Sequence, residues 1–323
     1  MNMGGADLWV WGIFLAVIVV LLAFDLGVLN KKDHEMSMGE SARLSLFYIS
    51  IGLAFGLFIW VQFDANRAFQ YYTGFILEKT LSLDNIFVIA LIFGYFNIPR
   101  EFQHRVLFWG IIGAIILRAI LIGAGSAIVA EFEWVLYIFA AFLIFTGIKM
   151  LKSGDEDEEP DLSQNKVLKF LRSRYAITDD IHGNKFAVML PNAQGVITKH
   201  FTPLFVALVL VECADVVFAL DSVPAIFMIT NDTFVIYTSN IFAILGLRAM
   251  FFILSAALKR FEYLQFALSI LLIFIGSKIF LAHILFPETH KFPAGLSLGI
   301  TVGILAAGVI YSLIKTKDTH TSE

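Results

Sequence analysis

Two stretches of this 323-residue sequence place carboxylates inside runs of otherwise apolar residues. The first is LEKTLSLDNIFVIALIF (77–93) and the second is VECADVVFALDSVPAIF (211–227). Their candidate metal ligands all carry side-chain oxygens: Glu78, Asp84 and Asn85 in the first stretch, and Glu212, Asp215, Asp221 and Ser222 in the second. A charge at the centre of a bilayer costs ~3 kcal/mol on insertion scales, so such residues usually mark an ion or proton pathway.

The chemistry of these side chains favours a hard cation. Carboxylate, amide and hydroxyl oxygens are typical ligands of Mg²⁺, Ca²⁺ and Mn²⁺, whereas histidine and thiolate suit zinc and copper. The only cysteine, Cys213, lies about 100° round the helix from Glu212 and is interpreted as a small packing residue. We place His283 near the outer end of its span, as an interfacial residue.

Buried carboxylates need compensation, and three basic residues within spans are the protein's own candidates: Arg118, Arg248 and Lys278. A purely structural network of salt bridges is one interpretation of this set. The five carboxylates outnumber the three bases, and Lys79 is expected to extend toward the outer surface. The surplus of negative charge favours a divalent cation, or a cation that alternates with protons.

Helix geometry constrains how these carboxylates act. At about 100° per residue, Glu212 and Asp215 share a face, whereas residues six apart differ in direction by about 120°. A straight helix therefore does not aim Asp215 and Asp221 at one point. Pro224 cannot donate a hydrogen bond to the Leu220 carbonyl, so a kink or unwound turn is predicted near residues 219–224.

The elements that position these residues are membrane helices. The chain is 59% hydrophobic and only 15% charged, and its apolar residues gather in long runs, which is typical of a membrane protein. About twenty apolar residues cross a bilayer as a helix. This rule predicts an all-α polytopic protein with about nine spans, at about 8–29, 42–62, 71–96, 105–129, 132–151, 200–229, 233–257, 262–285 and 293–314.

The spans group around one long connection. Residues 1–151 contain spans one to five, residues 152–199 form a loop, residues 200–314 contain spans six to nine, and residues 315–323 form a tail. With the N-terminus outside, the inner loops hold sixteen Lys and Arg residues and the outer loops hold two. Because basic residues concentrate on the cytoplasmic side, the N-terminus is predicted outside, and the long loop and C-terminus inside. The N-terminal stretch lacks a basic region, so the first helix is expected to remain as a span.

An internal repeat relates spans three to five (71–151) to spans six to eight (200–285). Besides the two acidic stretches, AIILRA (114–119) resembles AILGLRA (243–249), and LIFTGIKM (143–150) resembles LIFIGSKI (272–279). These matches pair Arg118 with Arg248, and Lys149 with Lys278. Because each unit has an odd number of spans, the second enters the membrane from the opposite side. Inverted repeats of this kind are common in secondary transporters, where the substrate site lies near the midplane between them.

The connection between the repeats contains three recognisable segments. The acidic run DEDEEPD (155–161) is interpreted as solvated. KVLKFLRSRYAI (166–177) is predicted to be an amphipathic helix along the inner leaflet, and residues 183–205 are predicted to form a small β-hairpin. The chain has no strong basic patch for nucleic acid, no P-loop and no dinucleotide fingerprint, so an enzyme or an ATP-driven pump is not expected.

The E…LSLDN and FALDSVPA motifs, the nine spans and the long inner loop together resemble the TerC family of bacterial integral membrane proteins, and the layout is most similar to its Alx branch. The resemblance covers nearly the whole chain. It implies a transporter of the LysE-type superfamily in the bacterial cytoplasmic membrane, with Mn²⁺ as substrate, export as the direction and no organic cofactor. Protons are a candidate counter-ion, and the oligomeric state is left open.

Two alternatives to transport stay open at the level of sequence. One is a scaffold that does not transport but supplies metal to exported enzymes, since it would need the same site. The other is a membrane redox or tellurite-resistance protein, as the family name and the labels of some members imply. The redox alternative lacks support in these residues, because there is no second cysteine and no pair of histidines on one helix for haem.

Overall fold

The computed structural model describes residues 2–3, 6–27, 37–132, 134–152, 166–191, 196–257, 264–285 and 292–319. Within these ranges some side chains fall outside the description, among them those of Asp84, Asp221 and His283. The acidic run 155–161 also lies outside the described residues.

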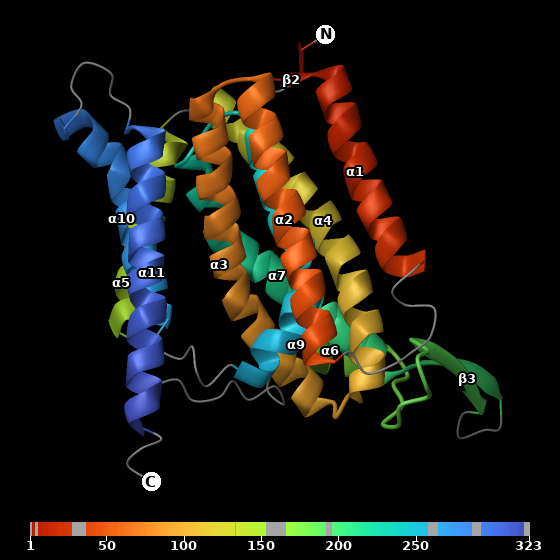
Figure 1. The fold of residues 1–323 in the computed structure, drawn as a ribbon. Helices are drawn as coiled ribbons and strands as arrows, with labels where there is room; N and C mark the ends of the chain where they lie inside the picture. Colours follow the sequence, from red (N-terminus) through yellow and green to blue (C-terminus); the bar gives the residue numbers. More distant parts are fainter. Residues whose placement is uncertain are drawn as a thin grey trace.

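Helices dominate the fold (Figure 1). They are α1 (Leu8–Gly27), α2 (Met38–Gln62), α3 (Ala65–Tyr95), α4 (Arg100–Glu131), α5 (Val135–Lys152), α6 (Lys166–Arg174), α7 (Pro203–Phe227), α8 (Thr233–Ile244), α9 (Leu247–Ala257), α10 (Leu264–Leu285) and α11 (Ala294–Thr319). Two short antiparallel pairs accompany them: β1 (Asn2–Met3) with β2 (Ala6–Asp7), and β3 (Ala187–Pro191) with β4 (Ile197–Phe201). The predicted all-α polytopic membrane architecture is confirmed.

The predicted spans match these helices one by one, with residues 233–257 divided between α8 and α9. Six of the described helices are long and apolar enough to cross a membrane: α1, α2, α4, α5, α7 and α11. The bent pair α8 and α9 provides a seventh candidate span. The other two predicted spans are α3, which carries Glu78 and Lys79 in its apolar stretch, and α10, whose described apolar part is Phe266–Ala282. The count of nine therefore stays a prediction.

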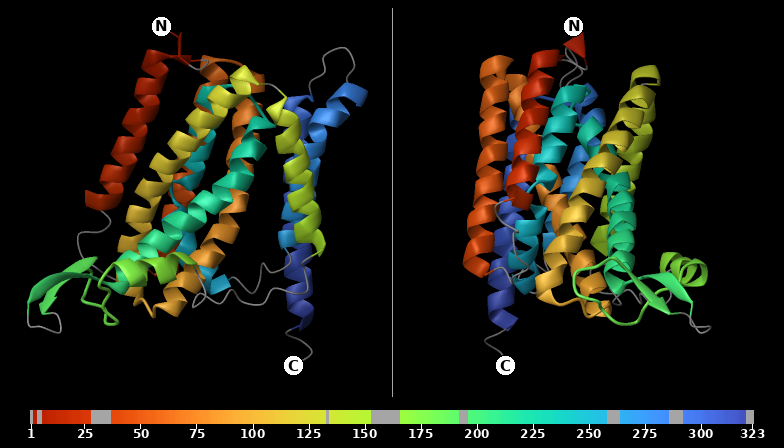
Figure 2. Two further views of the ribbon diagram at one scale, coloured as in Figure 1. Left: turned by 180° about the vertical axis from the view of Figure 1, so that it is seen from behind. Right: turned by 90° about the vertical axis from the view of Figure 1, so that its right-hand side faces the viewer.

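The start of α1 and the end of α11 lie at opposite ends of the bundle (Figures 1 and 2). An odd number of crossings produces this arrangement. The helix α6 and the β3–β4 hairpin lie at the same end as the end of α11 (Figure 2). The amphipathic helix and the hairpin predicted between the repeats are both present, with Leu168 and Leu171 of α6 buried against the bundle.

Aromatic packing fixes α8 against α1 and α2. Phe14 of α1, Phe55 of α2 and Phe234 and Phe242 of α8 are all buried in one cluster. The rings of Phe55 and Phe242 have centroids 4.5 Å apart. Burial of large aromatic side chains contributes much of the packing energy in such a cluster, so α8 has a firm position beside α1 and α2.

The helices α5, α10 and α11 stand together on one side of the bundle (Figure 2), where α5 and α10 pack closely through two glycines. A Cβ atom at Gly147 of α5 would lie 2.7 Å from the carbonyl oxygen of Ser269 in α10. A Cβ atom at Gly276 of α10 would lie 2.6 Å from the carbonyl oxygen of Ala140 in α5. Each glycine thus faces the residue seven positions before its counterpart. A two-fold relation between α5 and α10 would produce this reciprocal contact, while the full three-helix repeat stays a prediction.

The helix break is not where the proline suggested. The α7 helix continues without interruption through residues 219–224 and ends at Phe227, so the predicted unwound turn there is wrong, while the alternative, a kink in a continuous helix, stays a prediction. Pro224 lies in the last turn of α7, where the missing hydrogen bond disturbs little of the helix. The chain breaks instead between α8 and α9, which are bent by 43°, and Gly246 at the break has φ +83°.

Candidate functional site

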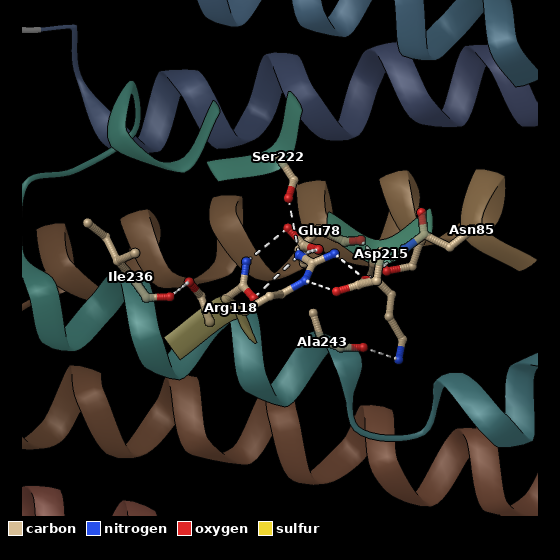
Figure 3. Close-up of polar contacts among 11 residues, drawn as sticks. Glu78, Asn85, Arg118, Asp215, Ser222, Ile236 and Ala243 are labelled. Carbon is tan, nitrogen blue, oxygen red and sulfur yellow. Dashed lines mark hydrogen bonds and ion pairs between the residues drawn. The ribbon is translucent and has the colours of Figure 1, made fainter. Parts of the chain in front are cut away.

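Arg118, in the middle of α4, is the centre of a polar cluster that the described residues form inside the bundle. Its side chain is 1% exposed and lies between two carboxylates (Figure 3). It forms an ion pair with Glu78 of α3, and its Nη2 and Nε donate to the Asp215 carboxylate of α7 at 3.0 and 3.3 Å. The guanidinium therefore binds Asp215 in the two-pronged geometry that arginine favours with carboxylates.

Neutral polar groups complete the surroundings of Arg118. Its Nη1 also donates to the Ser222 hydroxyl of α7 at 3.1 Å. The Asn240 amide of α8 donates to Glu78 Oε2 at 3.0 Å, and the Asn85 amide of α3 donates to Asp215 Oδ1 at 3.4 Å. These contacts satisfy the lone pairs that a buried carboxylate would otherwise leave without partners. Helices α3, α4, α7 and α8 all contribute to the cluster (Figure 3).

The cluster contains more negative than positive charge among its described side chains. Two carboxylates, Glu78 and Asp215, share the single guanidinium of Arg118. Burying ions costs several kcal/mol each unless their charges and hydrogen bonds are well matched. One positive charge cannot balance two negative charges, so this place in the bundle favours a further cation or a proton.

A small cavity adjoins the cluster between α3, α4 and α7, and the end of α8 and the start of α9 complete its wall. Its volume is about 30 Å³, and its polar lining consists of Asn85, Arg118 and Asp215. A cavity needs roughly 10–15 Å³ by this measure to hold one water molecule, so this one has room for an ion or a water. The Asn85 side chain is 7% exposed, and its Oδ1 has no hydrogen-bond partner among the described residues.

Glu212 lies one helical turn before Asp215 but outside the contacts of Arg118. Its carboxylate occupies the space that the missing side chain of Gly113 leaves open on α4. Its Oε2 is buried and has no hydrogen-bond partner in the described part of the chain. Glu212 is therefore a carboxylate with free coordinating capacity near Asp215, as the sequence interpretation of a ligand or proton carrier requires.

The other two predicted charge partners lie elsewhere, which corrects the expectation that Arg248 anchors the acidic cluster. Arg248 of α9 forms an ion pair with Asp25 of α1, and the Tyr48 hydroxyl of α2 donates to the same carboxylate at 3.2 Å. Lys278 of α10 donates to the Ser297 hydroxyl of α11 at 3.0 Å. Of the predicted partners, only Arg118 contacts the described carboxylates of the two motifs.

Lys79 does not extend to the outer surface but turns toward the break between α8 and α9. Its ammonium group donates to the carbonyl oxygens of Ala243 and Leu245 at 2.8 and 3.3 Å. Asn240 and this role of Lys79 were both missed by the sequence interpretation. The signal available for Asn240 was an amide in the apolar run FVIYTSNIFAIL. The signal for Lys79 was Gly246, which ends the helix and leaves the last carbonyl oxygens of α8 without partners within the helix.

The predicted ligand set is only partly placed. Asp84 lies in α3 and Asp221 in α7, but their side chains are outside the described ones. Glu78, Asn85, Asp215 and Ser222 come together around Arg118. Within the described side chains, no three of His, Cys, Asp and Glu gather closely enough to hold a metal ion by themselves. The single cysteine, Cys213, is a half-buried free thiol.

Fold and site together define a polytopic membrane protein with a buried cluster of charged residues between its helices. The chain belongs to the TerC family of integral membrane proteins. The sequence model of this family matches residues 63–320. It is 48% identical to an uncharacterised membrane protein of Rickettsia felis, over 94% of this chain and 97% of that one.

Two other relatives match over nearly their whole length. A membrane protein of Myxococcus xanthus is 42% identical over 97% of this chain and 94% of its own. A Salmonella typhi protein is 38% identical over 96% of this chain and 95% of its own, and its name describes a candidate membrane-bound redox modulator, Alx. No solved structure matches the chain.

Proposed function

We propose that the protein is a secondary transporter of hard divalent cations in the bacterial cytoplasmic membrane, with Mn²⁺ as the substrate and export from the cytoplasm as the direction. The N-terminus would lie outside, and α6, the hairpin and the C-terminus inside. Glu78, Asp84, Asn85, Glu212, Asp215, Asp221 and Ser222 remain the proposed ligand set.

The observation that carries this proposal is the shared cation of the two acidic motifs. Glu78 of α3 and Asp215 of α7 lie on opposite sides of one positive group, the Arg118 guanidinium (Figure 3). The two motifs thus already surround a cation with oxygen atoms from two helices. Oxygen-only surroundings suit Mn²⁺, Mg²⁺ and Ca²⁺.

Arg118 has a definite role in this proposal as the built-in counter-ion of the empty site. Without a metal, its charge limits the repulsion between the Glu78 and Asp215 carboxylates. A divalent cation competes for the same oxygens and brings one more positive charge than Arg118 supplies. Metal binding therefore displaces the guanidinium from at least one carboxylate, and metal release allows it to return.

The cavity gives the ion a place next to the cluster before it meets the carboxylates. The free Oδ1 of Asn85 and the Asp215 carboxylate face this space, and the Glu212 carboxylate lies one helical turn before Asp215 in α7. An ion that moves from Glu212 to Asp215 and then to Glu78 would follow successive oxygens. The proposed counter-ion is the proton, which the carboxylates take up when the metal leaves.

The first test measures Mn²⁺ flux into proteoliposomes for the wild type and for Asp215→Asn and Glu78→Gln. Each substitution keeps the shape of the side chain but removes one negative charge from the proposed site. Loss of a group that binds or orients a metal reduces affinity or activity by roughly 10–100-fold, and we expect flux to fall by that amount. Asp84→Asn and Asp221→Asn extend the same measurement to the two carboxylates whose positions are not described.

Glu101→Gln, an exposed carboxylate at the start of α4, is the matched control and is expected to keep full flux. Unchanged flux in Asp215→Asn and Glu78→Gln would refute the site. Tight Mn²⁺ binding without flux in the wild type would favour the metal-supplying scaffold. The redox role that the name of the Salmonella typhi relative suggests would require a bound chromophore or a reactive Cys213 in the purified protein.

A further inference from the structure

The break between α8 and α9 lies in the wall of the cavity beside the acidic cluster. Ile244, the last residue of α8, and Leu247, the first residue of α9, both line that cavity together with Asp215. The α9 helix lies toward the end of the bundle where α6 is found (Figure 1). The two residues that flank the break therefore form part of the cavity wall, and α9 runs from this wall toward that end of the molecule.

Gly246 gives the break its backbone freedom. Its φ of +83° is a conformation that residues with a side chain rarely adopt, and it joins two helices bent by 43°. A Cβ atom at this position would lie 2.6 Å from the Cβ atom of Tyr48. The equivalent stretch of the first repeat, AIILRA, lacks this residue, and α4 runs through it unbroken. The stretch with Gly246 thus has a helix break that the similar stretch of α4 does not have.

Lys79 connects this pivot to the acidic cluster. The last carbonyls of a helix have no partner within the helix, and here the Lys79 ammonium binds those of Ala243 and Leu245. The neighbouring residue, Glu78, accepts a hydrogen bond from Asn240 one turn earlier in α8. Two consecutive residues of α3 therefore hold the last turns of α8, one through the site and the other at the pivot.

A second polar contact holds α9 on its other side. Arg248 forms its ion pair with Asp25 of α1, and the Tyr48 hydroxyl binds the same carboxylate. The first turn of α9 is thus attached by charged and polar contacts that an alternative position of α9 would exchange. Phe251, one turn further along, packs in the apolar cluster of α3, α4 and α7.

We propose that α9 is a gate helix that pivots at Gly246 and opens the cavity toward the inner end, and that Lys79 is the positioning residue that couples this movement to the Glu78 site. The inference rests on the proposed function, because the gate would determine from which side of the membrane the ion reaches the acidic cluster. A metal that takes the Glu78 carboxylate from Arg118 and Asn240 shifts residues 78 and 79 together. The carbonyls of Ala243 and Leu245 then lose their ammonium partner, and α9 is free to turn.

The experiment follows a single cysteine on α9. Ile253→Cys is introduced into a Cys213→Ala protein, which removes the only native thiol, and its reaction with a maleimide is measured in liposomes with and without Mn²⁺. Labelling follows the population of the open form, so Mn²⁺ should raise the labelling rate by roughly threefold or more. Without metal, Lys79→Met should also raise the rate, whereas Lys79→Arg should keep the wild-type rate because it retains the cation.

Two further variants separate the pivot from general strain. Gly246→Ala should reduce Mn²⁺ flux by roughly tenfold, the change in rate that a backbone cost of about 1.4 kcal/mol produces, while Mn²⁺ binding is kept. Gly183→Ala is the matched control, because Gly183 also has positive φ, at +58°, but has no atom within contact distance of a new Cβ. Lys169→Met, at an exposed lysine of α6, controls for the loss of a positive charge.

The outcomes distinguish this inference from the proposed function. If the wild type transports Mn²⁺ but neither Mn²⁺ nor Lys79→Met changes the labelling rate of Ile253→Cys, the gate is refuted and the proposed transport function is kept. If the wild type neither binds nor transports Mn²⁺, the proposed function fails. The metal-free comparison of Lys79→Met with Lys79→Arg then still decides whether Lys79 holds α9, and equal rates would overturn the inference.

Discussion

Arg118 and Arg248 occupy matching positions in the two copies of the sequence LRA, yet the helices that carry them differ. Arg118 lies in an unbroken α4 and binds two carboxylates, one from each acidic motif. Arg248 follows a helix break by two residues and binds Asp25 of α1, a helix outside the predicted repeat. One arginine holds the acidic helices together, and the other attaches α9 to the edge of the bundle.

This difference shows how two similar stretches of sequence can take different roles. The inserted Gly246 ends α8 early and turns α9 away, so the side chain of Arg248 reaches α1 instead of the acidic cluster. Arg248 keeps an Nη1 atom that is buried without a partner among the described residues. Buried donors without partners are costly, so the Arg248 contact is the less completely satisfied of the two.

The strongest test of this comparison is Arg118→Met against Arg248→Met. Removing one partner of a buried ion pair costs about 3–5 kcal/mol, and Arg118→Met leaves two carboxylates without their cation. We expect its unfolding temperature in detergent to fall further than that of Arg248→Met. Saturating Mn²⁺ should restore much of the loss in Arg118→Met, because the metal replaces the missing positive charge.

Arg248→Met is the matched control for this rescue, since it also loses a buried arginine but lies outside the acidic cluster. Mn²⁺ should stabilise it no more than it stabilises the wild type. Equal rescue of both variants, or none in either, would contradict the separate roles of the two arginines.

A smaller effect is expected for Asp25→Asn. The asparagine oxygen still accepts from Tyr48 and Arg248, so the change weakens hydrogen bonds to a charged group and costs roughly 1.5–3 kcal/mol. Urea or SDS titration of the purified protein measures this loss. Mn²⁺ affinity by calorimetry should stay within twofold of the wild type, whereas Asp215→Asn should weaken it. A clear loss of affinity in Asp25→Asn would place the Arg248 contact inside the ion site.

The sequence was sufficient for the helices and for part of the site. Runs of about twenty apolar residues specify membrane helices directly, because backbone groups in lipid must find partners within the helix. The meeting of Glu78 with Asp215 was expected from charges inside two apolar spans, which are too costly to face lipid. Arg118 was predicted beside them for the same reason.

Other features depended on tertiary packing that periodicity does not describe. The partner of Arg248 depends on how α1 packs, and α1 lies outside the predicted repeat. The sequence interpretation therefore did not pair Asp25 with Arg248. Asn240 carries no charge and did not stand out in its apolar run. Pro224 drew attention to α7, although the single inserted Gly246 in AILGLRA was the stronger local signal for a break.

The smallest expected effect concerns the predicted two-fold relation itself, tested at Gly147 and Gly276. A methyl group at either position meets a backbone carbonyl of the facing helix, at 2.7 Å for Gly147 and 2.6 Å for Gly276. Overpacking of this kind costs on the order of 1 kcal/mol when the helices can separate slightly. If α5 and α10 are related by two-fold symmetry, Gly147→Ala and Gly276→Ala should lower stability by similar amounts.

Gly299→Ala in α11 is the control, because its new methyl meets no atom within 4 Å and alanine favours helix. A large loss of stability in only one of the two variants would show that α5 and α10 are similar in sequence but not related by two-fold symmetry.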